Sequence, residues 1–192
     1  MNAPIDISGI VLTTDRLILR SWHEEDLEDF YAYAKVDGVG QMAGWLPHDS
    51  IDVSQSILSS FIQSKNVFAL EYHGKVIGSL GVERYKESQF PALADKRGRE
   101  IGYVLSKDYW GQGLMPEAVN AVLDWLLLVQ QLDFVMVGHF DWNTQSRRVI
   151  EKCSFQFLCE TIHPTRYVTV ENCREYILTR ECWEKRRLKG YT

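Results

Sequence analysis

The chain has 192 residues, of which 45% are hydrophobic and 24% are charged, a balance typical of a folded globular protein rather than a disordered or fibrous one. Its 21 basic and 26 acidic residues leave a net charge of −5, which predicts no nucleic-acid or membrane partner and weakly favours a cationic one. No apolar run approaches the ~18 residues that span a bilayer, and Met1 to Ser8 lacks the basic and apolar parts of a signal peptide. We therefore expect a cytoplasmic protein whose residues 1–192 form one domain.

The first part of the chain predicts a strand, two helices and a hairpin. Leu12–Arg20 alternates between two faces, as a strand does. Glu24–Lys35 follows a capping-box spacing that begins at Ser21, and its apolar residues recur at helical spacing, which indicates an amphipathic helix. A second helix and two strands joined by a tight turn are expected at Val53–Ser64, Val67–Tyr72 and Lys75–Val82.

The second part predicts strands that alternate with helices. The charged segment Arg84–Arg99 is interpreted as a loop. Asn143 is a good N-cap, so a helix is expected from there to Cys153. The other expected elements are a helix at Pro116–Val129 and strands at Arg99–Leu105, Phe134–Phe140, Phe157–Thr161 and Tyr176–Thr179. This order predicts an α/β protein in which helices cover both faces of one mixed sheet.

The cysteines give no sign of a metal site. None of the four forms a C-x-x-C pair, and no pair of histidines stands at zinc-finger spacing. Without a secretory signal, disulfides are also not expected. We interpret Cys153, Cys159, Cys173 and Cys182 as reduced thiols that act as small apolar side chains.

The segment that carries chemistry is a glycine-containing turn between a strand and a helix. Gly111 and Gly113 allow the main chain to turn tightly and to approach a ligand. The turn leads into a helix N-terminus, where unpaired N–H groups favour an anion such as a pyrophosphate. Leu114 and Met115 replace the Lys and Ser/Thr of a Walker A loop, which argues against a nucleotide hydrolase. A plain connection between strand and helix remains the alternative.

Residues around this turn resemble a known family. The string Asp108-Tyr-Trp-Gly-Gln-Gly-Leu-Met-Pro-Glu-Ala-Val119 resembles the acetyl-CoA pyrophosphate loop of the GNAT N-acetyltransferases, most closely the RimJ and RimL branch of ribosomal-protein N-terminal acetyltransferases. Leu12–Arg20, Arg99–Leu105 and Asn143–Phe155 resemble further segments of that branch in the same order. The resemblance implies a GNAT fold with its core at about residues 12–180. In that fold, helices flank a central, mostly antiparallel, twisted sheet of about six to seven strands, which is splayed at the cofactor site.

The resemblance implies acetyl-CoA as co-substrate, bound mainly by the main chain, and no metal. The end of one strand, Tyr103, Val104 and Leu105, would pair with the pantetheine arm. Asn143 would bind a pantetheine amide in addition to capping its helix, although the cap alone explains an asparagine there. The amides that would hold the pyrophosphate belong to Gly111, Gln112, Gly113, Leu114 and Met115.

Two positions depart from the family pattern. Met115 stands where the pyrophosphate loop usually ends on a small residue. Its main-chain amide is still present, so we expect cofactor binding to persist with a local shift. Ser154 stands where the family has a glycine before Phe155, which affects a turn rather than catalysis.

The same resemblance implies catalytic and acceptor-binding residues. Glu100 would act as the general base, directly or through water; a surface pair with a neighbouring arginine is the alternative. Ser146 matches a serine that would face the thioester sulfur and donate to the thiolate; the alternative is a plain helix-surface serine. Trp45 and Leu46 lie in a loop that would shape the acceptor pocket, or would serve in ordinary packing.

The resemblance implies an enzyme that transfers acetyl from acetyl-CoA to a primary amine by direct attack in a ternary complex. The branch implies a protein N-terminal amine as acceptor, as in a ribosomal protein. Two alternatives remain open: a small amine such as a polyamine or aminoglycoside, and a non-catalytic CoA-binding module that regulates a partner. A peptide acceptor requires an open groove, whereas a small amine requires a closed pocket with carboxylates. A homodimer is compatible with the branch.

Overall fold

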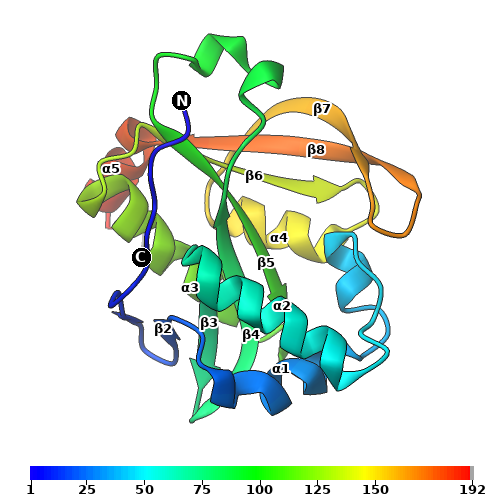
Figure 1. The fold of residues 1–192 in the computed structure, drawn as a ribbon. Coiled ribbons are helices and arrows are strands. Elements are labelled where there is room, and N and C mark those ends of the chain that lie inside the picture. The colour runs from blue at the N-terminus through cyan, green and yellow to red at the C-terminus, as the bar shows by residue number, and fades with distance from the viewer. Residues whose placement is uncertain (191–192) are drawn as a thin grey trace.

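The computed structural model describes residues 1–190. Within these residues, eight strands form one sheet in the order β1-β2-β3-β4-β5-β6-β8-β7 (Figure 1). The strands are β1 (Leu12–Thr13), β2 (Ile18–Arg20), β3 (Val67–Tyr72), β4 (Lys75–Glu83), β5 (Gly98–Leu105), β6 (Phe134–Phe140), β7 (Gln156–Pro164) and β8 (Val170–Thr179). The helices are α1 (Leu27–Ala34), α2 (Ile51–Ser64), α3 (Leu114–Leu123), α4 (Thr144–Lys152) and α5 (Arg180–Leu188).

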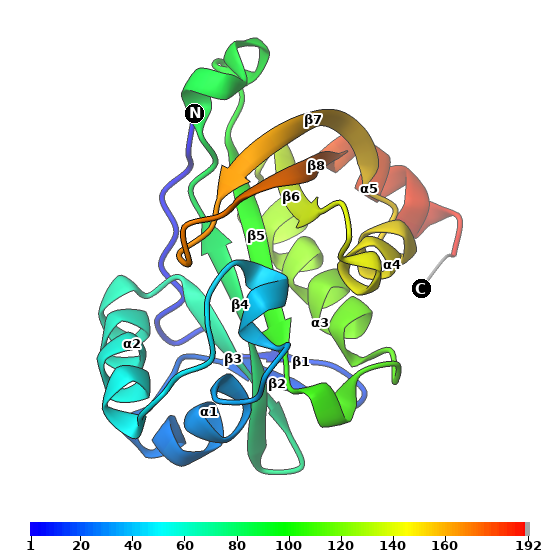
Figure 2. The ribbon, with the colours of Figure 1, turned by 90° about the vertical axis from the view of Figure 1, so that its right-hand side faces the viewer.

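The sheet is mixed and mostly antiparallel, as the sequence predicts. Neighbouring strands of the described chain run antiparallel except for β5 and β6, which pair in parallel. Helices cover both faces: α1 and α2 lie on one, and α3, α4 and α5 on the other (Figure 2). The sheet has eight strands rather than the six to seven expected, because Leu12–Arg20 contributes two.

Alternation along the inner strands builds one core on each face. Phe68 and Leu70 of β3 pack in the core beneath α3, whereas Val67 and Ala69 pack in the core beneath α1 and α2. Successive side chains of a strand point to opposite faces, so a strand buried on both sides is apolar throughout. The continuous apolar run of β3 follows from this double burial.

The strands β5 and β6 part in the middle of the sheet. Their pairing runs from Gly98 opposite Phe134 to Ile101 opposite Val137, and the register contains no pair beyond that point. Both strands nevertheless continue, to Leu105 and to Phe140. The predicted splay is therefore present, and it leaves main-chain groups of both strands without a neighbouring strand.

The expected strand Leu12–Arg20 is instead a tight hairpin. Leu12 pairs with Leu19 and Thr13 with Ile18. The Thr14 hydroxyl closes the turn, because it accepts a hydrogen bond from the Leu17 N–H at 2.9 Å. Alternation of apolar residues predicted the extended conformation correctly, but it does not reveal a reversal of direction within the run.

Several helix boundaries differ from the sequence prediction. α3 begins at Leu114, two residues before Pro116, and Asp124–Val129 continues it as a π-helix. The capping carboxylate before α1 is Asp26, which accepts from the His23 N–H at 2.8 Å, rather than the Ser21 box. α5 has no counterpart among the expected helices. Two strands extend further than expected, β7 to Pro164 and β8 back to Val170.

The cysteines carry no disulfide, and all four are free. Within residues 1–190, no three His, Cys, Asp or Glu side chains come together as a set able to hold a metal ion. Among the helices of the described chain, none has the length and apolar character needed to cross a membrane.

Ser154 occupies the strained position at the end of α4, which generates a stability prediction. Its φ angle is 64°, in the left-handed region that favours glycine. We expect Ser154→Gly to raise the free energy of unfolding by about 1 kcal/mol, and the Tm by about 2–4 °C, because the strain is relieved. Thermal unfolding followed by circular dichroism measures this. Ser154→Ala keeps the strain and serves as the control, and an unchanged Tm for the glycine variant would contradict the prediction.

Candidate functional site

A cavity of about 650 Å³ opens where β5 and β6 part. The splayed halves of these two strands form its floor, and the N-terminus of α3, the outer turns of α4 and part of β8 form its walls. Val39, Met42 and Ala43, from the segment between α1 and α2, close one side. The cavity thus extends from a helix N-terminus at one end to the middle of the sheet at the other.

The glycine-containing turn forms the helix end of the cavity. Gly111 and Gly113 have φ angles of 78° and 77°, and Gly113 is the N-cap residue of α3. In the described chain, no acceptor lies within hydrogen-bond reach of the main-chain N–H groups of residues 111–115. Unpaired amides at a helix N-terminus attract anions, so the turn fits the pyrophosphate that the sequence predicted for it.

Gln112 takes a different part in this turn from its neighbours. Gly111, Gly113, Leu114 and Met115 line the cavity, whereas Gln112 does not. Its side chain donates to the Asp108 carbonyl at 3.1 Å, and its own carbonyl accepts from Arg16 at 3.0 Å. The side chain of Gln112 therefore shapes the turn, and only the main-chain N–H of this residue is available to a ligand.

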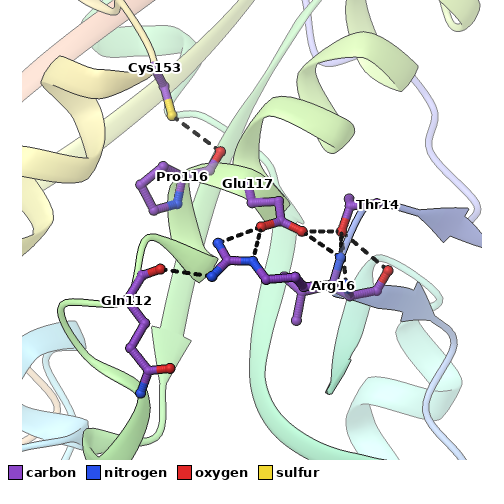
Figure 3. A network of polar contacts seen from close by, with 7 residues as sticks. Thr14, Arg16, Gln112, Pro116, Glu117 and Cys153 are labelled. Atoms are coloured by element: carbon purple, nitrogen blue, oxygen red, sulfur yellow. Dashed lines mark hydrogen bonds and ion pairs between the residues drawn. The ribbon is translucent and has the colours of Figure 1, made fainter. Parts of the chain in front are cut away.

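Arg16 braces the turn against the N-terminal hairpin (Figure 3). Its guanidinium forms an ion pair with Glu117 of α3 at 2.6 Å and donates to the Gln112 carbonyl at 3.0 Å. Thr14 donates to the other Glu117 oxygen at 2.6 Å. The hairpin between β1 and β2 thus fixes both the turn and the first turn of the helix behind it.

Met115 does not obstruct the turn. Its side chain is buried in the core cluster beneath α3. The methionine therefore directs its bulk into the core, and its main-chain N–H remains at the cavity. The departure at Met115 therefore no longer favours a non-catalytic CoA-binding module.

The free edge of β5 lies along the cavity. Tyr103, Val104 and Leu105 line it, as expected for the strand that would pair with pantetheine. The Leu105 carbonyl already accepts from the Trp110 indole N–H at 2.8 Å. Trp110 therefore closes the edge at its turn end, and the stretch from Gly102 to Val104 remains open to an extended ligand.

Asn143 is the N-cap of α4, as predicted. Its Oδ1 accepts from the Ser146 N–H at 3.0 Å, and its Nδ2 donates to the Met42 carbonyl at 3.0 Å. The side chain is buried and its amide is engaged at both ends. Asn143 thus joins α4 to the segment that carries Met42 and Ala43, and one N–H of its amide remains for a ligand.

Tyr103 and Ser146 meet at the wall of the cavity. The phenol oxygen lies 3.0 Å from the serine Oγ, and both residues line the cavity. Burial raises the pKa of the Tyr103 phenol well above its usual value, so the phenol keeps its proton at neutral pH. The resemblance implied only a main-chain role for Tyr103, because no local pattern reveals the tertiary contact of its hydroxyl with α4.

Glu100 lies on the cavity floor beside the last β5–β6 pair. It forms no ion pair within residues 1–190, and Arg99 instead donates to the Ala3 carbonyl at 2.6 Å, so the expected alternative of a surface pair is not observed. Burial, followed by the negative charges of Glu175 and Glu83, raises the pKa of Glu100 to about 7. A carboxyl group with this pKa is suited to accept and release a proton at neutral pH.

The far end of the cavity contains residues that lie outside the predicted site. Glu175 of β8 lines it, together with His139 and His163. His139 is buried between the Phe140 carbonyl at 2.8 Å and the Tyr176 hydroxyl at 3.2 Å. The expected strand began at Tyr176, so the sequence did not predict Glu175 as a strand residue that lines the cavity.

Trp45 and Leu46 do not reach the cavity lining. Trp45 packs against Gly40 and in the cluster beneath α1 and α2, and its ring lies 5.0 Å from that of His48. Leu46 is exposed. The loop contributes Met42 and Ala43 to the cavity instead, because the Asn143 bond holds that part of it over the opening.

Comparison with known proteins identifies the class. Residues 16–156 match the Acetyltransferase (GNAT) domain family. A relative from Bacillus subtilis (strain 168), named as the uncharacterized N-acetyltransferase YoaA, is 30% identical over 153 residues, which cover 76% of this chain and 82% of that protein. The protein is an acetyl-CoA-dependent N-acetyltransferase. It belongs to the GNAT family.

Solved structures share the fold. A GNAT-family acetyltransferase from Bacillus anthracis has a TM-score of 0.77 at 18% identity, covering 90% of this chain and 99% of that one. A ribosomal-protein-S5-alanine acetyltransferase from Vibrio fischeri has 0.69 at 19%, covering 91% and 98%. A spermidine N-acetyltransferase from Vibrio cholerae, in complex with CoA and spermine, has 0.71 at 15%, covering 89% and 99%. At these identities the likeness shows the GNAT fold alone.

The brace formed by Arg16 generates a binding prediction. We expect Arg16→Gln to raise the dissociation constant of CoA about two- to fivefold, because the ion pair with Glu117 that holds the turn is lost. Isothermal titration calorimetry measures this. Lys185→Gln is the control, since it removes an exposed pair with Glu181 on α5 and should leave the affinity unchanged. Equal affinities of wild type and Arg16→Gln would contradict the role of the brace.

Proposed function

We propose that the protein transfers acetyl to a primary amine by direct attack, with Glu100 as general base. The observation that carries the proposal is an unpaired carboxyl group with a pKa of about 7 on the floor of the cavity. When bound, acetyl-CoA supplies an acetyl group activated as a thioester. The amides of Gly111, Gln112, Gly113, Leu114 and Met115 hold its pyrophosphate, and the open edge at Tyr103, Val104 and Leu105 pairs with its pantetheine arm.

Glu100 takes the proton that the acceptor nitrogen must lose. As the nitrogen forms its bond to the carbonyl carbon and the carbon–sulfur bond breaks, this proton passes to the carboxylate, directly or through water. The group is ready for this role because burial and the charges of Glu175 and Glu83 keep its pKa close to neutral. No cysteine nucleophile is required, and burial raises the pKa of Cys153 to about 12, which keeps that thiol protonated.

Ser146 and Tyr103 serve the other side of the reaction. The departing sulfur needs a proton or a hydrogen-bond donor, and the Ser146 hydroxyl supplies one at the end of α4. Tyr103 lies 3.0 Å from that hydroxyl and orients it. Because burial keeps its phenol protonated, Tyr103 remains a hydrogen-bond partner of the serine hydroxyl at neutral pH.

The acceptor is one of two classes of primary amine. Residues of the pyrophosphate turn that resemble the RimJ and RimL branch favour a protein N-terminus. The carboxylates of Glu100 and Glu175 in the cavity favour a small cationic amine, because a closed pocket with carboxylates was the condition for that acceptor and the carboxylates are present. The solved relatives include an acetyltransferase of each kind. We give precedence to the small amine, because the carboxylates lie in the cavity itself, whereas the resemblance is carried by the turn assigned to the pyrophosphate.

The cysteines, the resemblance and the net charge support proposals for the location and the partners of the protein. We place the protein in the cytoplasm, where its four free cysteines stay reduced. A homodimer would fit the branch that its turn resembles. Neither nucleic acid nor membrane is a proposed partner, given a net charge of −5.

The base role of Glu100 predicts a pH dependence. Since the carboxylate must be deprotonated, kcat/KM should rise as the pH increases through about 7, apart from a second rise caused by titration of the amine itself. Glu100→Gln should lower kcat/KM by about 100-fold or more and abolish the rise near pH 7. Release of CoA thiol across pH 5.5–9 with a panel of primary amines measures both effects. Full activity of Glu100→Gln at every pH would rule out the assignment.

The donor role of Ser146 predicts coupled effects. Ser146→Ala should lower kcat about tenfold or more without raising the dissociation constant of CoA. Tyr103→Phe should also lower kcat, and the double variant should be little worse than Ser146→Ala, since the phenol acts through the serine. Single-turnover rates and CoA titrations measure these effects. An unchanged rate in Ser146→Ala would remove its donor role, and fully additive losses would remove the role of Tyr103 in orienting the serine.

A further inference from the structure

We propose that Glu175 is a specificity-determining residue that binds a second positive charge on the acceptor, so that the preferred acceptor is a dicationic amine of the α,ω-diamine type. The inference rests on the proposed function, because Glu100 marks the position of the reacting nitrogen. It goes beyond that function by assigning the far end of the cavity a ligand group of its own.

The register of the sheet places Glu175 on the same face as Glu100. Glu100 pairs with Met136 of β6, and Gly138, two residues further along β6, pairs with Glu175 of β8. Paired residues share a face, and so do residues two apart on one strand. Both carboxylates therefore project from the floor of the cavity, from strands separated by β6.

Gly138 allows the carboxylate of Glu175 to lean across β6. A Cβ atom added at Gly138 would lie 2.8 Å from the Oε2 atom of Glu175, so the carboxylate occupies the space that a side chain would fill. It is thereby displaced from β8 towards β5, the strand that carries Glu100. The charge of Glu175 acts on Glu100 from this position and raises the pKa of that group.

One oxygen of Glu175 is oriented by the protein. The Thr161 hydroxyl of β7 donates to its Oε1 at 2.9 Å. Within the described residues, the Oε2 atom receives no hydrogen bond from the protein. The threonine thus fixes the rotamer, and the second oxygen is available to a ligand that enters the cavity.

Neither carboxylate forms an ion pair in the described chain. Arg174, next to Glu175 in sequence, points to the opposite face and pairs with Asp141 at 2.7 Å and Glu160 at 3.5 Å. Glu83, the cross-strand neighbour of Glu100, is negative and accepts from the Asn66 amide at 3.0 Å. Two like charges confined to one cavity repel, and a ligand with two positive charges relieves that repulsion better than a ligand with one.

A diamine satisfies both carboxylates with one flexible chain. One nitrogen lies at Glu100 and gives up its proton for the reaction, while the other stays charged and is held by Glu175. A monoamine of the same length reaches Glu100 but leaves Glu175 without a partner. The difference in affinity between the two ligands therefore measures the contribution of Glu175.

Calorimetry with matched amines tests the proposal. Protein with saturating CoA is titrated with 1,4-diaminobutane, 1,5-diaminopentane and 1,6-diaminohexane, and with the monoamine of the same carbon number in each case. We expect the best diamine to bind about tenfold or more tightly than its monoamine. Glu175→Gln, which can keep the Thr161 hydrogen bond, should remove most of that preference and change monoamine binding less than about twofold.

Glu160→Gln is the matched control, because it removes one negative charge from β7 outside the cavity and should preserve the preference. Equal binding of every diamine and its monoamine to the wild type overturns the proposal, and so does a preference that Glu175→Gln retains. Acetyl transfer to the same amines keeps the two proposals apart. A diamine preference without transfer to any amine would contradict the proposed function alone. Transfer with equal KM for diamines and monoamines would contradict the role of Glu175 alone.

Discussion

The end of the β5–β6 pairing is the constraint on which the rest of the structure depends. The last pair between the two parallel strands is Ile101 with Val137, although both strands continue beyond it. Buried main-chain groups left without partners are costly, so an interrupted sheet interior is stable only where ligand or solvent can reach it. The cavity, the free edge for an extended ligand arm and the position of Glu100 at the end of the pairing all result from this one interruption.

The cavity is electrically polarised along its length. At one end, the amides before α3, which have no partner within the described residues, carry the positive end of the helix dipole. At the other end lie the carboxyl groups of Glu100 and Glu175, which form no ion pair within residues 1–190. This polarity suits the proposed transfer from a phosphate-bearing donor at one end of the cavity to a cationic amine at the other.

Local patterns predicted those elements whose signals are themselves local. The strands Val67–Tyr72 and Phe134–Phe140 have the expected bounds, and Asn143 caps its helix as expected. The failures involve long-range contacts. The first residues of β8, from Val170, and the helix α5 have weak local signals. Tertiary contacts hold them instead: β8 pairs with a strand on each side, and α5 buries Trp183. Trp45 follows the packing alternative rather than the acceptor-pocket one, since it packs on Gly40 and does not line the cavity.

The sequence by itself determined the class of fold, the family and the turn that would hold a pyrophosphate. Glycine spacing and a helix N-terminus act within a few residues, so a linear pattern carries their physics. Only the tertiary structure decided which side chains share the cavity. The meeting of Tyr103 with Ser146, the brace from Arg16 to Glu117 and the leaning of Glu175 over Gly138 join residues from separate elements. Strand register and helix packing fix such contacts, and both depend on the whole chain rather than on any one segment.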